Sequence, residues 1–136
     1  MNTENTEMIR KDLTEKIIRV FYDVYFELGY GFLEKVYHNA MLIELRSRGF
    51  ACESQKKIQV FYKERDVGEY YADILVNDVI ILELKAAEVL APEHEQQLIN
   101  YLRATQIEVG LLFNFGKKPE IRRKIFTNDR KKAVSV

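Results

Sequence analysis

The chain has 136 residues, of which 47% are hydrophobic and 31% are charged, and its formal net charge at pH 7 is zero. This composition excludes a disordered chain, and the length predicts a single domain over residues 1–136 that can bury its own core. The single cysteine, Cys52, excludes an intramolecular disulfide and a cysteine-based metal cluster, in keeping with a reducing cytoplasm.

We do not expect the N-terminal segment to be a signal peptide. Residues 1–7 are polar and acidic, which is not the pattern of a signal peptide. No apolar run approaches the roughly 20 residues that a membrane span requires. We therefore expect a cytoplasmic protein that does not contact a membrane.

Helical periodicity dominates the first third of the chain. Apolar residues recur at helical spacing from Ile9 to Leu28, and the segment 29–31, which contains two glycines, interrupts this pattern. A second helix is predicted over residues 33–48, with Gly49 directly after its end.

The remaining chain alternates strands and one helix. We predict strands at 58–62, 70–76 and 79–86, separated by a charged turn at 63–66 and a tight turn at 77–78. A helix follows over 91–104, with a proline in its first turn, and then a strand over 109–115; residues 121–126 could add a short edge strand.

The third predicted strand carries two charges in an otherwise apolar run. Residues 79–86 are apolar on both faces, as in a buried central strand, except at Glu83 and Lys85. Alternation places these two side chains on the same face. Burying a charge costs several kcal/mol unless it is paired or metal-bound, so these residues are candidates for a site. Taken alone, the pattern is explained better by an ion pair at a strand end, with Asp73 as a surface acid near a turn.

A first motif lies at the start of the second predicted helix. Gly31, Glu34 and Tyr37 have the spacing of the pattern that names the GxxExxY family. That family is similar to the PD-(D/E)XK nuclease superfamily.

Three further motifs resemble those of the superfamily and occur in the expected order. Asp73 and the triplet from Glu83 to Lys85 are similar to the acid and the E-x-K of its name, and Gln97 with Tyr101 is similar to the Gln-x-x-x-Tyr helix motif of its exonuclease-like branches. The resemblance covers residues 17 to 115. It implies an α/β fold with a restriction-endonuclease-like core, in which helices flank a central mixed β-sheet. Ala72 stands where the superfamily's name has proline, a position at which members often vary.

Phosphodiester hydrolysis is the reaction in which these residues would act. The reaction needs a nucleophilic water and neutralised charge on the phosphoryl oxygens, both of which Mg²⁺ or Mn²⁺ supplies. The carboxylates of Asp73 and Glu83 are expected to lie close enough together to bind one metal ion, with the Leu84 carbonyl as a third ligand. Lys85 is expected in the same cleft, where it orients the water or stabilises the developing charge.

Three other residues complete the expected site. Glu34 either complements the dipole of its helix or overhangs the metal as a third carboxylate, and the resemblance favours the second role. Gln97 and Tyr101 share a helix face, and the resemblance implies that they hold a phosphate or the catalytic lysine. The alternative is an exposed glutamine beside a half-buried tyrosine. His38 and His94 are expected at the surface or the site rim.

Basic residues are concentrated after residue 116. They are Lys117, Lys118, Arg122, Arg123, Lys124, Arg130, Lys131 and Lys132, against Glu120 and Asp129. This segment is either a solvated tail or a local patch that binds nucleic acid. A local patch would be needed for such binding, because a net charge of zero provides no basic field over the whole protein.

These observations lead to two expected functions. The first is a Mg²⁺-dependent nuclease that acts on DNA, with dimerisation a possibility because so small a domain has little surface to grip a duplex. The alternative is a non-catalytic nucleic-acid-binding or protein-interaction module of the same fold.

Overall fold

A five-stranded sheet organises the protein, and the computed structural model describes residues 10–131. Its elements in chain order are α1 (Lys11–Leu28), α2 (Glu34–Ser47), β1 (Cys52–Tyr62), β2 (Arg65–Val76), β3 (Ile80–Lys85), α3 (Pro92–Arg103), β4 (Val109–Phe115), β5 (Pro119–Ile125) and the short 3₁₀ helix η2 (Asn128–Arg130).

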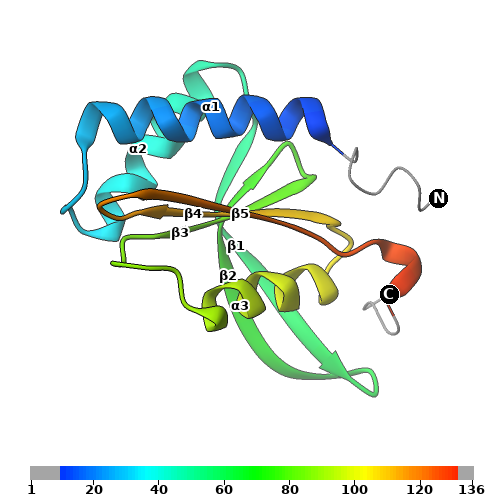
Figure 1. The fold of residues 1–136 in the computed structure, drawn as a ribbon. Helices are drawn as coiled ribbons and strands as arrows, with labels where there is room; N and C mark the ends of the chain where they lie inside the picture. The colour runs from blue at the N-terminus through cyan, green and yellow to red at the C-terminus, as the bar shows by residue number, and fades with distance from the viewer. Residues whose placement is uncertain (1–9, 132–136) are drawn as a thin grey trace.

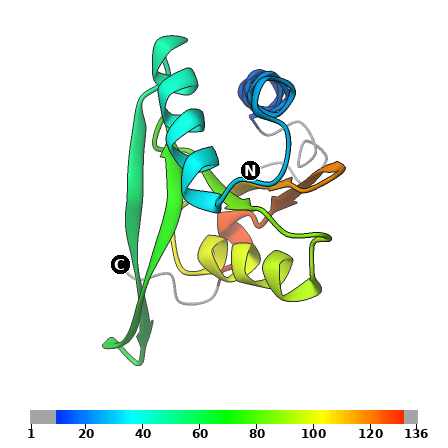
Figure 2. The same ribbon diagram turned by 90° about the vertical axis from the view of Figure 1, so that its left-hand side faces the viewer.

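The sheet is mixed, and its strand order is β1-β2-β3-β4-β5. Among these described strands, β3 and β4 form the one parallel pair, and α3 makes the crossover between them, whereas the other three neighbouring pairs are antiparallel. Helices α1 and α2 lie over one face and α3 over the other (Figures 1 and 2). The predicted architecture, a central mixed sheet flanked by helices, is therefore confirmed.

Both faces of the sheet bury apolar side chains, which explains the near-continuous apolar runs of β3 and β4. On the α1 side, the Phe21 ring stacks on Phe113 with centroids 4.4 Å apart. On the α3 side, Leu98 packs among side chains of β3 and β4. A Cβ at Gly110 would lie 2.5 Å from Leu98 Cδ1, so this glycine permits α3 to approach β4 closely.

The first two strands are longer than predicted. The strand β1 begins at Cys52 instead of residue 58, and β2 begins at Arg65 instead of residue 70. The strand β2 pairs with β3 only from Ile74 to Val76, so residues 56–72 extend beyond the rest of the sheet as a two-stranded arm (Figure 1). Much of the arm is exposed, so it lacks the apolar alternation by which half-buried strands are recognised.

The tip of the arm also lacks the usual turn signal. Lys63 and Glu64 occupy the two turn positions with φ of 50° and 65°, which asparagine and glycine normally adopt. The predicted turn at 63–66 is therefore too long by two residues. The tight turn at Asn77 and Asp78 is confirmed, with φ of 50° and 60°.

Within residues 10–131, no helix has the length and apolarity that crossing a membrane would require.

Candidate active site

The two predicted acids lie where β2 and β3 separate. The backbone ladder between these strands ends at the pair Ile74–Leu82. Beyond it, the Asp73 amide donates a hydrogen bond of 2.8 Å to Glu83 Oε2, and the Leu84 amide donates one of 2.7 Å to Asp73 Oδ2. The carboxylates thus replace the backbone ladder and hold the separating strands side by side. These bonds use one oxygen of each carboxylate, so the other oxygen of each is available as a ligand.

The Leu84 carbonyl points into the same gap. The amide and carbonyl of one strand residue are directed toward the same neighbouring strand, as the exchange of bonds within a paired position requires. Because the Leu84 amide bonds to Asp73 on β2, the Leu84 carbonyl is also on the β2 side, beyond the end of the ladder. Two carboxylate oxygens and one backbone oxygen therefore border one gap between the strands.

The two carboxyl groups lie in a desolvated environment. Glu83 is only 3% exposed, and burial, followed by the charge of Asp73, raises the pKa of Glu83 to about 8. Burial also raises the pKa of Asp73, although the bond from the Leu84 amide opposes this effect. The pair therefore holds a proton near neutral pH when no cation is bound.

This shift predicts how stability depends on pH. The pKa of Glu83 is raised from 4.5 to about 8, so the folded state binds the proton more tightly than the unfolded state does. The resulting stabilisation is complete below about pH 4.5 and is lost as the pH rises through about 8. Without metal, Glu83→Gln should be more stable than the parent at about pH 9 by on the order of 5 kcal/mol, and the difference should shrink toward about pH 5. Urea titrations of both proteins in chelator across this range measure it; a constant difference would show that Glu83 is not protonated in the folded state.

Lys85 and Glu34 join this neighbourhood from different elements. Ile81 packs against α3, so alternation along β3 directs Glu83 and Lys85 to the same side. Partial desolvation raises the pKa of Glu34, the nearby Lys85 ammonium lowers it, and the charge of Asp73 raises it again. The structure thus brings Glu34, at the start of α2, within electrostatic range of the strand residues.

The segment before α2 explains the spacing of Gly31, Glu34 and Tyr37. Gly31 has a φ of 109°, which side-chain-bearing residues rarely adopt. The buried Tyr37 hydroxyl donates a 2.6 Å bond to the Gly29 carbonyl and accepts a 3.2 Å bond from the Phe32 amide. Tyr37 is thus a core aromatic residue whose hydroxyl is hydrogen-bonded to the preceding loop. These contacts fix the loop that delivers Glu34.

The helix α3 brings Tyr101 within electrostatic range of the two acids. Burial, followed by the charges of Glu83 and Asp73, raises the pKa of the Tyr101 hydroxyl to about 12. Its ring lies 5.9 Å from that of Tyr70 on β2. Gln97 is half-buried one turn earlier on α3, and the predicted bond from Gln97 to a phosphate or to Lys85 stays a prediction.

The two histidines lie at the rim, as expected. The charges of both lower the pKa of Glu34, and that of His38 also lowers the pKa of Asp73. His38 Nε2 is 2.9 Å from Ser54 Oγ on β1. His94 Nδ1 accepts a 3.1 Å bond from the Ala91 amide at the start of α3, so a neutral His94 carries its proton on Nε2.

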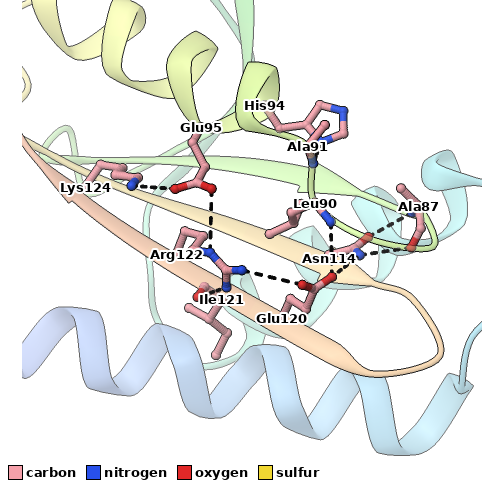
Figure 3. A network of polar contacts seen from close by, with 10 residues as sticks. All are labelled: Ala87, Leu90, Ala91, His94, Glu95, Asn114, Glu120, Ile121, Arg122 and Lys124. Carbon is pink, nitrogen blue, oxygen red and sulfur yellow. Dashed lines mark hydrogen bonds and ion pairs between the residues drawn. The ribbon is translucent and has the colours of Figure 1, made fainter.

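A buried asparagine that sequence analysis missed holds the loop after Lys85. Asn114 on β4 is fully buried and stands opposite Lys85 in the parallel register. Its side chain accepts a 2.8 Å bond from the Ala87 amide and donates bonds of 2.9 Å to the Ala87 carbonyl and to Glu120 (Figure 3). Glu120 also accepts a 3.2 Å bond from the Leu90 amide. A polar residue in the apolar run 109–115 was the available signal, because buried amides require partners.

Ion pairs extend this network to α3 and correct the interpretation of the basic segment. Arg122 and Lys124 on β5 lie 3.7 Å and 2.6 Å from the Glu95 carboxylate of α3, and Arg122 lies 3.6 Å from Glu120 (Figure 3). The solvated-tail interpretation is therefore wrong for these residues, which belong to a strand and pair with acids. Lys132 lies outside the described residues.

The oxygen donors at the gap match what Mg²⁺ prefers. Within residues 10–131, no three His, Cys, Asp or Glu side chains converge closely enough to form a ready-made metal cage. Mg²⁺ does not need one, because one or two carboxylates usually hold it while water and substrate phosphates fill the other positions. Asp73, Glu83 and the Leu84 carbonyl, all oxygen donors bordering one gap, fit this requirement. Glu34 as a third carboxylate ligand stays a prediction.

Comparison with known proteins gives one family and one fold. A family model described as the PD-(D/E)XK nuclease superfamily matches residues 11–124. The crystal structure of SSO0001 is similar with a TM-score of 0.56 and 17% sequence identity, over 71% of this chain and 52% of that chain. The present chain thus spans about half the length of that protein, and the likeness shows the fold alone. No curated protein matches the chain significantly.

Proposed function

Because the chain belongs to the PD-(D/E)XK nuclease superfamily, we propose that it is a Mg²⁺- or Mn²⁺-dependent nuclease that hydrolyses phosphodiester bonds in DNA. The observation that carries this proposal is the pair of carboxylates at the gap between β2 and β3. Each uses one oxygen to bond the opposite strand's backbone, and each keeps one oxygen for a cation.

The chemistry divides among the chain's own residues. Asp73 and Glu83 would hold the cation, with the Leu84 carbonyl beside them. A bound divalent cation neutralises phosphoryl oxygens and makes a bound water more acidic. Lys85 would stabilise negative charge that develops during cleavage, or orient the attacking water. Glu34 and Tyr101 would complete the polar wall from α2 and α3.

Membership of the GxxExxY branch is part of the same proposal. The structural roles of the three motif residues support this membership. Gly31 has a backbone conformation suited to glycine, Glu34 lies within electrostatic range of Lys85, and the Tyr37 hydroxyl anchors the loop. The branch would add Glu34 to the site that the superfamily motif describes.

Cleavage assays with controlled metal test the proposal. Labelled single-stranded and duplex DNA, and matching RNA, are incubated with the purified chain in Mg²⁺, in Mn²⁺ and in chelator. We expect cleavage of DNA in either metal and none in chelator, with Asp73→Asn as the inactive control. Binding without cleavage in any metal would replace the nuclease with a non-catalytic binding module. A chain that neither binds nor cleaves would point to a protein partner.

A further inference from the structure

A groove of about 940 Å³ lies between the arm (residues 56–72) and α3, on the side of the sheet that carries the acids. Its lining comes from β1 and β2 on one side and from α3 on the other, so the groove has one wall of strand and one wall of helix. The two views show the arm extending past α3 (Figures 1 and 2). Of the residues that line this groove, only Gln97 and Tyr101 are expected at the candidate active site.

Aromatic rings line the groove at intervals. Phe61 and Tyr70 on the arm are 39% and 49% exposed, so solvent and ligands can reach both rings. Tyr101 on α3, only 5% exposed, and the half-buried Phe126 after β5 also line it, so Phe61 and Tyr70 present the exposed rings. Exposed ring faces along a groove are suited to stacking with planar groups of a ligand.

Cations and amides supply the polar part of the lining. The guanidinium groups of Arg103 and Arg130 lie 5.8 Å and 4.7 Å from the centre of the Phe126 ring, so two cations and one ring form a cluster at the groove. The lining contains one acid, Glu93, against these two arginines. Lys131 also lines it, but its ammonium donates to the Thr105 and Ile107 carbonyls. Side-chain amides, which can both donate and accept hydrogen bonds, come from Gln59, Gln96, Gln97 and Asn100.

The groove borders the candidate active site, because Gln97 and Tyr101 of α3, both expected at that site, line it. Tyr101 lines the groove and also interacts electrostatically with Glu83 and Asp73. Its ring packs against Tyr70, which lines the opposite wall. The part of the groove at Tyr101 is therefore the part nearest the acid pair.

We propose that this groove binds unpaired nucleotides of a nucleic-acid strand and leads that strand to Asp73 and Glu83. Base rings stack on aromatic side chains and on arginine planes, while the cations attract phosphates. A duplex fits this lining poorly, because its base faces are already covered by neighbouring bases. The excess of cations over acids also favours a polyanion over a neutral apolar peptide. The guiding role rests on the proposed function, whereas the binding itself does not.

Binding measurements with matched variants test the inference. Fluorescence anisotropy follows a labelled oligothymidylate and a blunt duplex of equal length, in chelator, so that no cleavage occurs. Phe61→Ala should weaken oligothymidylate binding about 5- to 100-fold, the usual effect of removing one stacking platform. Duplex binding should change less than about two-fold, because no unpaired base contacts the ring.

Neighbouring residues provide the controls. Tyr62→Ala removes a ring that is 63% exposed on the same strand and does not line the groove, so it should leave both affinities unchanged. Arg130→Gln should weaken oligothymidylate binding, whereas Arg19→Gln, an exposed arginine of α1 on the other side of the sheet, should not. Thermal melts of every variant show that each is folded.

The outcomes separate this inference from the proposed function. Equal losses in Phe61→Ala and Tyr62→Ala, or equal losses for oligothymidylate and duplex, would overturn the groove assignment. Oligothymidylate binding that depends on Phe61 without cleavage in any metal would retain the groove and remove the nuclease. Cleavage of single-stranded DNA at the same subsaturating rate by parent and Phe61→Ala would retain the nuclease and overturn the groove.

Discussion

Lys85→Ala is expected to abolish cleavage while preserving binding. A positioned cation that stabilises developing charge contributes on the order of 10²- to 10³-fold to the rate, so single-turnover cleavage in Mg²⁺ should slow by at least that factor. Binding of the intact substrate should stay within a few-fold of the parent, because only interactions that strengthen in the transition state accelerate the reaction. Quench-flow cleavage and anisotropy on the same labelled DNA measure both quantities.

The control is a lysine near the site that does not enter it. Lys35 is exposed on α2 directly after Glu34, and Lys35→Ala removes the same charge from the same region. It should alter cleavage little. A similar loss of rate in both variants would reduce the role of Lys85 to general attraction of the polyanion. A loss confined to binding in Lys85→Ala would lead to the same conclusion.

Asp73→Asn is expected to remove metal binding and activity without unfolding the protein. Asparagine retains an oxygen that can accept the bond from the Leu84 amide, so the strands remain joined at the gap. It removes one of two acids that repel each other, so stability in chelator should be unchanged or higher. Cleavage should fall by about 10³-fold or more, since loss of the metal forfeits several kcal/mol of charge stabilisation.

Thermal melts with and without Mg²⁺ complete this test. The parent should gain about 3 kcal/mol at a metal concentration near 100 times Kd, and Asp73→Asn should gain nothing. Asp73→Ala adds a contrast, because it leaves the Leu84 amide unpaired and should cost about 1–3 kcal/mol in chelator. If Asp73→Asn also loses several degrees in chelator, the acids are structural partners of a cation such as Lys85, and the metal assignment fails.

Much of the fold was predictable because its signals are local. Helical spacing placed α1, α2 and α3 within two residues of their observed ends, and the apolar run of β4 matched residues 109–115. The arm was not predicted in full, because an exposed two-stranded arm needs no apolar alternation, and its Lys63–Glu64 turn carries no glycine or asparagine. The strand β5 was only suggested, since its charges resemble those of a solvated segment.

Part of the candidate site was also predictable from the sequence, and part depends on the tertiary structure. From the sequence we predicted Glu83 and Lys85 as charges in an apolar run, and Glu34 and Asp73 through the resemblance to a family. Only the tertiary structure decided that Asp73 and Glu83 bond crosswise to the backbone of the opposite strand, and that Asn114 holds the loop after Lys85. The groove between the arm and α3 is likewise visible only in the tertiary structure. These features depend on where strands separate and on which distant residues meet, and no periodicity within one segment encodes either.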